Sequence, residues 1–175
     1  RQMCIRDRYY AGMVDRVRGK CDDDVVRKLE IIMQQAGVTP DICPAVAACL
    51  KKAEETAAPA GAMVLPDGRV VTGKTSDTLG AASALLLNAL KAQGGIDDQF
   101  ELISAQVLEP VCRLKTQYLG HRNPRLHSDE VLIALSISAV TNPLAERVLK
   151  KLDDLRGCDA HFSVIISEED EKLYK

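Results

Sequence analysis

The segment 69–90 combines a short β-like run with groups that can bind an anion. Four residues at the end of that run supply these groups: Gly73, Lys74, Thr75 and Ser76. An almost uncharged apolar stretch follows directly, and we expect it to form a helix over 76–92. The N-terminus of a helix offers free N–H groups and a partial positive charge, so this position favours a phosphate or a carboxylate. The alternative is plain helix capping, with a hydroxyl accepting an N–H bond and the lysine solvated.

Residues 68–75 also match the phosphate-loop pattern G-x-x-x-x-G-K-[ST]. A genuine loop of this kind would bind a nucleoside triphosphate. The intervening residues 69–72 are mostly β-branched and resemble a strand, and Asp67-Gly68 is better explained as a hairpin turn. Nucleotide binding through a degenerate P-loop therefore stays as a second alternative, with Asp159 as the sole candidate for an acidic Mg²⁺ ligand.

The densest polar cluster of the sequence covers residues 121–130. Arg122 and Arg125 carry guanidinium groups that can bind a carboxylate or phosphate with two hydrogen bonds. Three neighbours are candidates for proton transfer, and we treat them as the candidate catalytic residues: His127, Asp129 and Glu130. The structural alternative is that they cap the following helix and place acids in its first turn.

Metal and cofactor motifs are absent from the sequence. His121 and His127 lack a second closely spaced ligand pair, so we expect no metal site. The six cysteines form no C-x-x-C pair. Their scattering suits reduced thiols, and we expect a cytoplasmic protein. No motif in the sequence indicates a particular cofactor, so the cofactor stays unknown.

The charge and hydropathy of the chain argue against two classes of partner. The formal net charge is −2, from 23 basic and 25 acidic side chains, whereas nucleic-acid binders usually carry a basic excess. The longest apolar runs, near 79–90 and 131–140, are too short to span a bilayer. We therefore expect no nucleic-acid and no membrane partner, and leave homo-oligomerisation open.

The hydrophobic pattern predicts a helix-rich, mixed α/β fold of the α+β type. Helices 76–92 and 128–140 are apolar nearly all round, so they should be buried. Amphipathic helices should cover them, near 22–36, 104–119 and 143–156. A small sheet of about three strands completes the prediction, with a β-hairpin at Pro66-Asp67-Gly68 and a strand at 160–166. Pro110 should kink or divide helix 104–119.

The ends of the chain predict its domain organisation. The N-terminal RQMCIRDR resembles a translated sequencing adapter, so we expect residues 1–9 to be an artefact or disordered. We expect residues 10–175 to form one domain-sized fragment of a longer protein, with a helical lead-in over 10–60 and a core over 61–175. Ser167 begins an acidic run typical of a helix start, so the C-terminus reads as a cut.

Three long motifs carry a family resemblance: TGKTSDTLGAASALLLNALK, HRNPRLHSDEVLIALSISAVTNPLAERVL and LRGCDAHFSVIIS. From about Tyr10 to the C-terminus the chain resembles the bacterial family known as domain of unknown function 1846. The resemblance implies a cytoplasmic protein considerably longer than this chain. It transfers no catalytic residue, but it directs attention to the two polar motifs above.

Two functions of different kinds therefore compete. The first is an enzyme, or a fragment of one, that binds a small phosphorylated or carboxylated metabolite through the two motifs. The second is a non-catalytic ligand-binding or assembly module, in which the same groups are caps and interface contacts. Convergence of the two motifs in space would favour the first.

Overall fold

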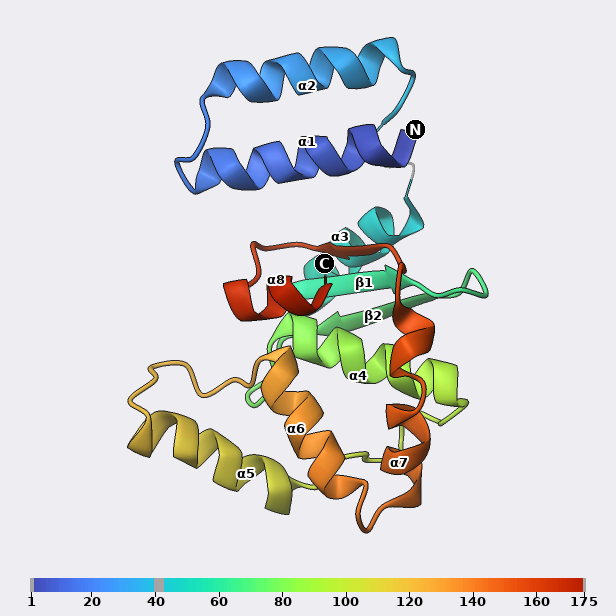
Figure 1. The fold of residues 1–175 in the computed structure, drawn as a ribbon, viewed down its shortest axis with the longest axis vertical. Helices are drawn as coiled ribbons and strands as arrows, with labels where there is room; N and C mark the ends of the chain where they lie inside the picture. The colour runs from blue at the N-terminus through green and yellow to red at the C-terminus, as the bar shows by residue number, and fades with distance from the viewer. Residues whose placement is uncertain (1, 40–42, 175) are drawn as a thin grey trace. The chain divides into compact units, whose positions relative to one another are not determined.

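The computed structural model describes residues 2–39 and 43–174, with side chains from Ile5 onward. The chain divides into two compact units, residues 1–43 and 44–175. Figure 1 shows the elements of each unit.

The first unit is a helical hairpin of α1 (Gln2–Val17) and α2 (Asp23–Gln35). Val26 and Met33 of α2 are buried, and Gly37 takes the left-handed conformation that ends the helix. Because α1 is continuous, the expected boundary after residue 9 does not coincide with the end of an element. The adapter origin of the first residues stays a prediction.

The second unit contains all the residues singled out as a candidate site. It begins with α3 (Pro44–Thr56), β1 (Ala60–Val64), β2 (Val70–Lys74) and α4 (Ala81–Gly94). It continues with α5 (Ala105–Arg113), the π-helical η2 (Leu114–Tyr118), α6 (Ser128–Ser138) and α7 (Pro143–Leu149). It ends with the 3-10 helix η3 (Leu152–Leu155), β3 (Ala160–Phe162) and α8 (Glu168–Tyr174). The predicted helix-rich, mixed α/β class is confirmed.

The described strands form one antiparallel sheet in the order β2-β1-β3. The predicted hairpin is confirmed: the Gly68 N–H donates to the carbonyl of Leu65 at 2.9 Å, and Gly68 has φ of 84°. Figure 1 shows α3 and α4 on opposite sides of the sheet. This explains why the first four residues of β1 are buried although its side chains alternate between the two faces.

A pair of glycines brings α4 close to the sheet. Gly61 of β1 lies opposite Gly73 of β2 in the register. A Cβ added at Gly73 would lie 2.3 Å from the backbone nitrogen of Leu85, and one at Gly61 would lie 3.1 Å from the Cδ2 of Leu85. Leu85 itself is fully buried. Gly73 is therefore required by packing, which is a different role from the ligand contact that the sequence suggested.

Several predicted elements differ in extent from those of the structure. The helix expected over 76–92 begins only at Ala81, after a loop that holds residues 75–80. Helix 104–119 is divided as Pro110 predicted, into α5 and η2. The expected strand 160–166 is shorter, and helix 143–156 ends early and continues as η3.

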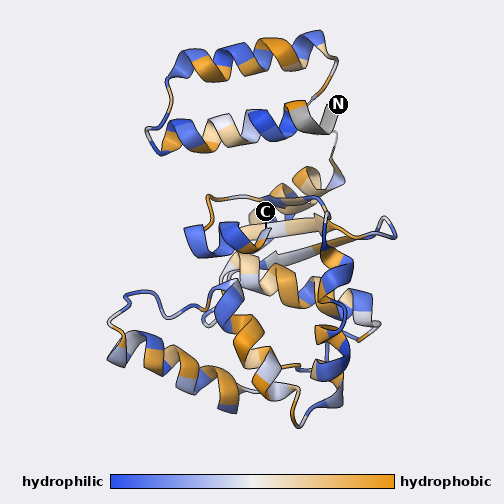
Figure 2. Ribbon diagram, in the orientation of Figure 1, coloured by the Kyte–Doolittle hydropathy of each residue, from blue (hydrophilic) through white to orange (hydrophobic). Residues whose placement is uncertain are grey.

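The two apolar helices are covered to different degrees. Helix α4 buries eight of its residues, as its apolar surround predicted. Helix α6 buries Val131, Ala134 and Leu135, but Ile133 and Ile137 are 62% and 54% exposed. Figure 2 shows the orange, hydrophobic character of both helices. The described part of the chain therefore covers α6 on one side only.

Candidate functional site

The structure brings the two polar motifs together where their two loops pair. Leu79 and Leu126 form an isolated parallel β-bridge. The N–H of Leu126 donates to the carbonyl of Thr78 at 2.8 Å, and the buried Ser83 hydroxyl donates to the carbonyl of Leu126 at 2.5 Å. The loop 75–80 and the loop 119–127 consequently lie side by side.

A direct side-chain contact joins these loops. The Nε of Arg125 donates to the carbonyl oxygen of Ser76 at 2.7 Å. The Arg125 N–H is held in turn by the side-chain oxygen of Asn123 at 3.1 Å. Two residues predicted from separate motifs, Ser76 and Arg125, are therefore neighbours across 49 positions of sequence.

The lysine-threonine-serine motif lies at the end of a strand and not at a helix N-terminus. Lys74 is the exposed last residue of β2, and the N–H of Thr75 donates to the carbonyl of Pro59 at 2.8 Å. The hydroxyl of Ser76 accepts a bond from the N–H of Leu79 at 3.1 Å. The expected contribution of a helix dipole to an anion site at these residues was wrong, because α4 begins several residues later at Ala81.

The P-loop alternative is also wrong. The residues between the two glycines of the pattern belong to β2, whose backbone groups pair with β1 over Val70–Lys74. A P-loop needs those N–H groups free to surround a phosphate. In this chain the backbone groups of Val70–Lys74 form the hydrogen bonds of the hairpin instead.

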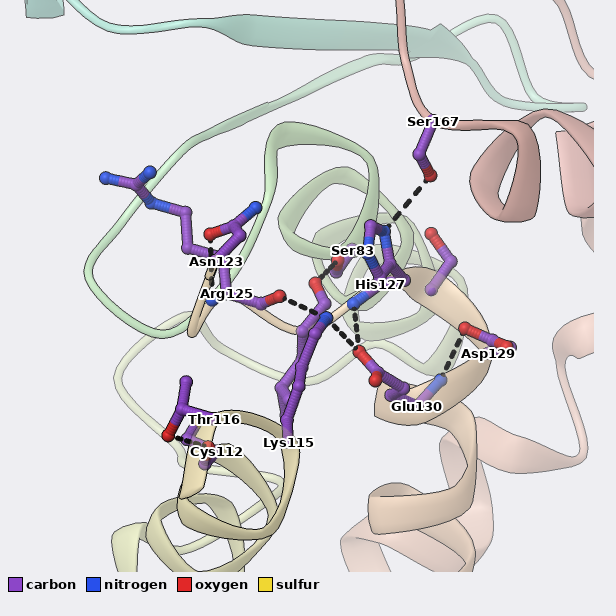
Figure 3. A network of polar contacts seen from close by, with 12 residues as sticks. Ser83, Cys112, Lys115, Thr116, Asn123, Arg125, His127, Asp129, Glu130 and Ser167 are labelled. Carbon is purple, nitrogen blue, oxygen red and sulfur yellow. Dashed lines mark hydrogen bonds and ion pairs between the residues drawn. The ribbon is translucent and has the colours of Figure 1, made fainter. Parts of the chain in front are cut away.

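Glu130, one of the three candidate catalytic residues, serves the local structure. Its Oε2 accepts bonds at 2.7 Å from the backbone N–H of His127 and from the Nζ of Lys115. The same Nζ donates to the carbonyl of Arg125 at 2.7 Å (Figure 3). The side chain of Lys115 is 3% exposed and that of Glu130 is 26% exposed. This partly buried ion pair fixes the backbone of the loop at both Arg125 and His127.

The other two candidates differ in environment. Asp129 is exposed, and its carboxylate accepts the N–H of Glu130 at 2.8 Å, as expected for an acid in the first turn of a helix. His127 precedes α6, and its side chain is 24% exposed. Its Nδ1 lies 3.0 Å from the hydroxyl of Ser167 and 3.3 Å from Oδ2 of Asp170.

Asp170 is a site residue that the sequence did not reveal. It lies on α8, its side chain is 8% exposed, and its Oδ1 accepts both the N–H of Ser128 at 2.8 Å and the Ser128 hydroxyl at 2.6 Å. Burial raises the pKa of Asp170, but the hydrogen bonds from Ser128, His127 and Ser167 lower it by a larger amount. The pKa therefore lies below its ordinary value of 3.8. The only sequence signal was the spacing of Ser167 and Asp170, which indicated a helix start.

The acid stability of the second unit should depend on Asp170. Because its pKa is lower in the folded chain, the carboxylate stabilises the fold above the unfolded value near 3.8, and this stabilisation is lost as the pH falls from there through the folded value. We expect the free energy of unfolding of the wild type to exceed that of Asp170→Asn at neutral pH, and the difference to shrink in this acid range. Urea unfolding followed by circular dichroism across the pH range measures it. A difference that does not change with pH would contradict the prediction.

The cationic residues of the two loops remain available to solvent. Lys74 and Arg122 are exposed, and within residues 2–39 and 43–174 neither forms an ion pair or a hydrogen bond through its side chain. In Figure 3 the guanidinium group of Arg125 extends away from the imidazole of His127. The loops therefore present cations on one part of their surface and the histidine on another.

Three further features of the described residues bear on chemistry and on membrane contact. Cys112 lies in α5, and burial raises the pKa of its thiol, so it is a poor nucleophile. In the described part of the chain no three or more His, Cys, Asp and Glu side chains gather as a metal would require. Over the same residues no helix has the length and apolarity needed to cross a bilayer.

Comparisons with known proteins agree with the resemblance inferred from the three motifs. The family model described as "Domain of unknown function DUF1846, C-terminal" matches residues 41–175. A UPF0371 protein of Corynebacterium efficiens is 48% identical over 175 residues, which is 100% of this chain and 35% of that protein. A UPF0371 protein of Streptococcus thermophilus is 42% identical with the same coverage. The chain thus spans about a third of the length of these curated relatives. The predicted resemblance is confirmed, and the chain belongs to the DUF1846 family, whose C-terminal domain model matches it.

Proposed function

We propose that the two adjacent loops bind a small anion, a phosphate or carboxylate group of a metabolite. The bond from Arg125 to the carbonyl of Ser76 supports this proposal most directly, because it joins the two motifs that carry the free cations. The binding groups would be the ammonium of Lys74, the hydroxyls of Thr75 and Ser76, and the guanidinium groups of Arg122 and Arg125.

The electrostatics of the loops favour this use. Exposed cations that lack ion-pair partners keep their charge available for a ligand. Only the Nε of Arg125 is used by the carbonyl of Ser76, so its two terminal nitrogens can still bind an oxyanion in the bidentate manner of arginine. The ion pair of Lys115 and Glu130 holds the backbone of the loop at Arg125 and His127. Little ordering of the loop is therefore needed when a ligand binds.

Titration with inorganic phosphate and with citrate tests the proposal. We expect the double variant Lys74→Ala/Arg125→Ala to bind at least tenfold more weakly than the wild type, since a tenfold change corresponds to about 1.4 kcal/mol and two charge-assisted contacts are removed. Isothermal calorimetry at low salt measures the affinity. Arg156→Ala is the control, because its side chain is 84% exposed, lies outside both loops and forms only a surface ion pair with Asp153.

The same experiment separates the proposal from its main alternative. Equal binding by the double variant and the control, or no binding by the wild type, would favour the non-catalytic assembly module. That alternative is supported by the exposed Ile133 and Ile137 of α6, which lie one helical turn apart. We also propose a cytoplasmic location and no nucleic-acid partner, and both stay predictions. Homo-oligomerisation stays open.

A further inference from the structure

The imidazole of His127 lies beside a carboxylate that is fully occupied by hydrogen bonds. Oδ1 of Asp170 accepts the N–H and the hydroxyl of Ser128. Oδ2 accepts the hydroxyl of Ser167 at 2.9 Å and lies 3.3 Å from Nδ1 of His127. An ionised carboxylate can only accept. A proton on Nδ1 would give this carboxylate a donor, whereas a lone pair there would face it without one, so the contact favours the Nδ1-protonated form.

The hydroxyl of Ser167 is arranged in the same sense. It accepts the N–H of Asp170 at 3.1 Å and donates its own proton to Oδ2 of Asp170. Its remaining lone pair lies 3.0 Å from Nδ1 of His127 and can accept the Nδ1 proton as well. Because both Ser167 and Asp170 contact Nδ1, this cluster is not a nucleophilic serine triad, in which the serine lies at Nε2.

The second ring nitrogen is left open. Nε2 of His127 has no hydrogen-bond partner among the side chains and backbone groups of residues 2–39 and 43–174. The side chain of His127 is 24% exposed, whereas that of Asp170 is 8% exposed, so part of the imidazole is accessible to solvent. Figure 3 shows the bond that holds the ring to Ser167.

We propose that His127 is a proton acceptor at Nε2, held in the Nδ1-protonated form by Asp170 and Ser167 of the α8 segment. In the transfer the O–H bond of a bound ligand or water breaks, its electron pair stays on that oxygen, and a new N–H bond forms at Nε2. The resulting imidazolium donates from Nδ1 to the Asp170 carboxylate, which stabilises its positive charge. The inference goes beyond the proposed anion site, because the guanidinium group of Arg125 extends away from the imidazole of His127. Asp170 is a positioning residue here, because it acts through the histidine.

The charged groups that face His127 come from two helices. Asp170 and Glu169 belong to α8, and the pKa of Glu169 is lowered chiefly by its backbone hydrogen bond, with a smaller contribution from His127. Glu130 belongs to α6 and accepts the His127 N–H. All three are acids, but the carboxylate of Glu130 is already paired with the ammonium of Lys115. Of these, Asp170 is the one that contacts the ring and also selects its tautomer.

Nitrogen-15 NMR of histidine-labelled chain tests the tautomer directly. The chain has three histidines, and His127→Gln assigns the signal of His127. In the neutral ring we expect Nδ1 with the shift of a protonated nitrogen and Nε2 with that of an unprotonated one. In Asp170→Asn we expect this preference to be lost, so that the shifts of the two nitrogens move toward each other.

Controls keep the test decisive. Glu168→Gln removes an exposed acid from the first turn of the same helix and should leave the tautomer unchanged. Ser167→Ala keeps the carboxylate and should keep the proton on Nδ1. If Asp170→Asn fails to fold, the wild-type spectrum alone decides, because an Nε2-protonated ring in the wild type would overturn the proposal. Phosphate titration of the same samples is a separate readout, so loss of anion binding and loss of the tautomer can be told apart.

Discussion

Leu85→Ala is expected to lower the free energy of unfolding by roughly 2–5 kcal/mol, the usual cost of truncating a buried leucine. The side chain is fully buried between α4 and the sheet. On the sheet side its Cδ2 faces Gly61, which has no side chain to move into the space left behind, and Gly73 holds the backbone of Leu85 close to the sheet. The cost should therefore lie in the upper part of that range, because a cavity that cannot collapse costs more.

Urea unfolding of the variant measures this loss. Leu50→Ala on α3 is the matched control, because Leu50 is 52% exposed and should cost less than about 1 kcal/mol. A loss below about 1 kcal/mol for Leu85→Ala would contradict the packing of α4 on the glycine pair.

Lys115→Met should destabilise the second unit by roughly 3 kcal/mol, at the low end of the range for removing one partner of a buried ion pair. The low end applies because Glu130 keeps 26% of its side chain exposed, so water can reach the carboxylate that is left. The carbonyl of Arg125 also loses its donor. We therefore expect two results: the loop 119–127 becomes more mobile, and the free energy of unfolding falls.

A double variant separates the ion pair from the packing of the lysine stem. Adding Glu130→Gln to Lys115→Met removes the unpaired charge and keeps an oxygen for the His127 N–H, so part of the lost stability should return. Urea unfolding gives the stabilities, and hydrogen exchange of the Arg125–Ser128 amides reports the loop. If the double variant were less stable than Lys115→Met alone, the charge on Glu130 would not be the source of the cost.

Much of the local structure could be predicted from the sequence because it depends on near neighbours. The turn at Pro66-Asp67-Gly68, the division of a helix near Pro110 and the helix start at Ser167 each follow from a few adjacent residues. Family membership was likewise carried by long unbroken motifs. These features need no knowledge of what packs against what.

The start of α4 shows why a near-neighbour pattern can mislead. Lys74-Thr75-Ser76 before an apolar run has the form of a helix cap. In the structure the segment up to Gly80 is a loop instead, because Leu79 pairs with Leu126 and the N–H of Gly80 donates to the carbonyl of Leu126. A partner 47 positions away decided the conformation, and no local preference could indicate it.

The sequence by itself determined the class of the fold, the hairpin, the family and the two motifs in which polar groups gather. Tertiary structure alone decided which of those groups meet. It joined Ser76 to Arg125, used Glu130 to neutralise the buried Lys115, and brought Asp170 of α8 to His127. The physical reason is that a hydrogen bond or ion pair between distant residues depends on the packing of the helices that carry them, whereas composition and periodicity report only the face that each helix buries.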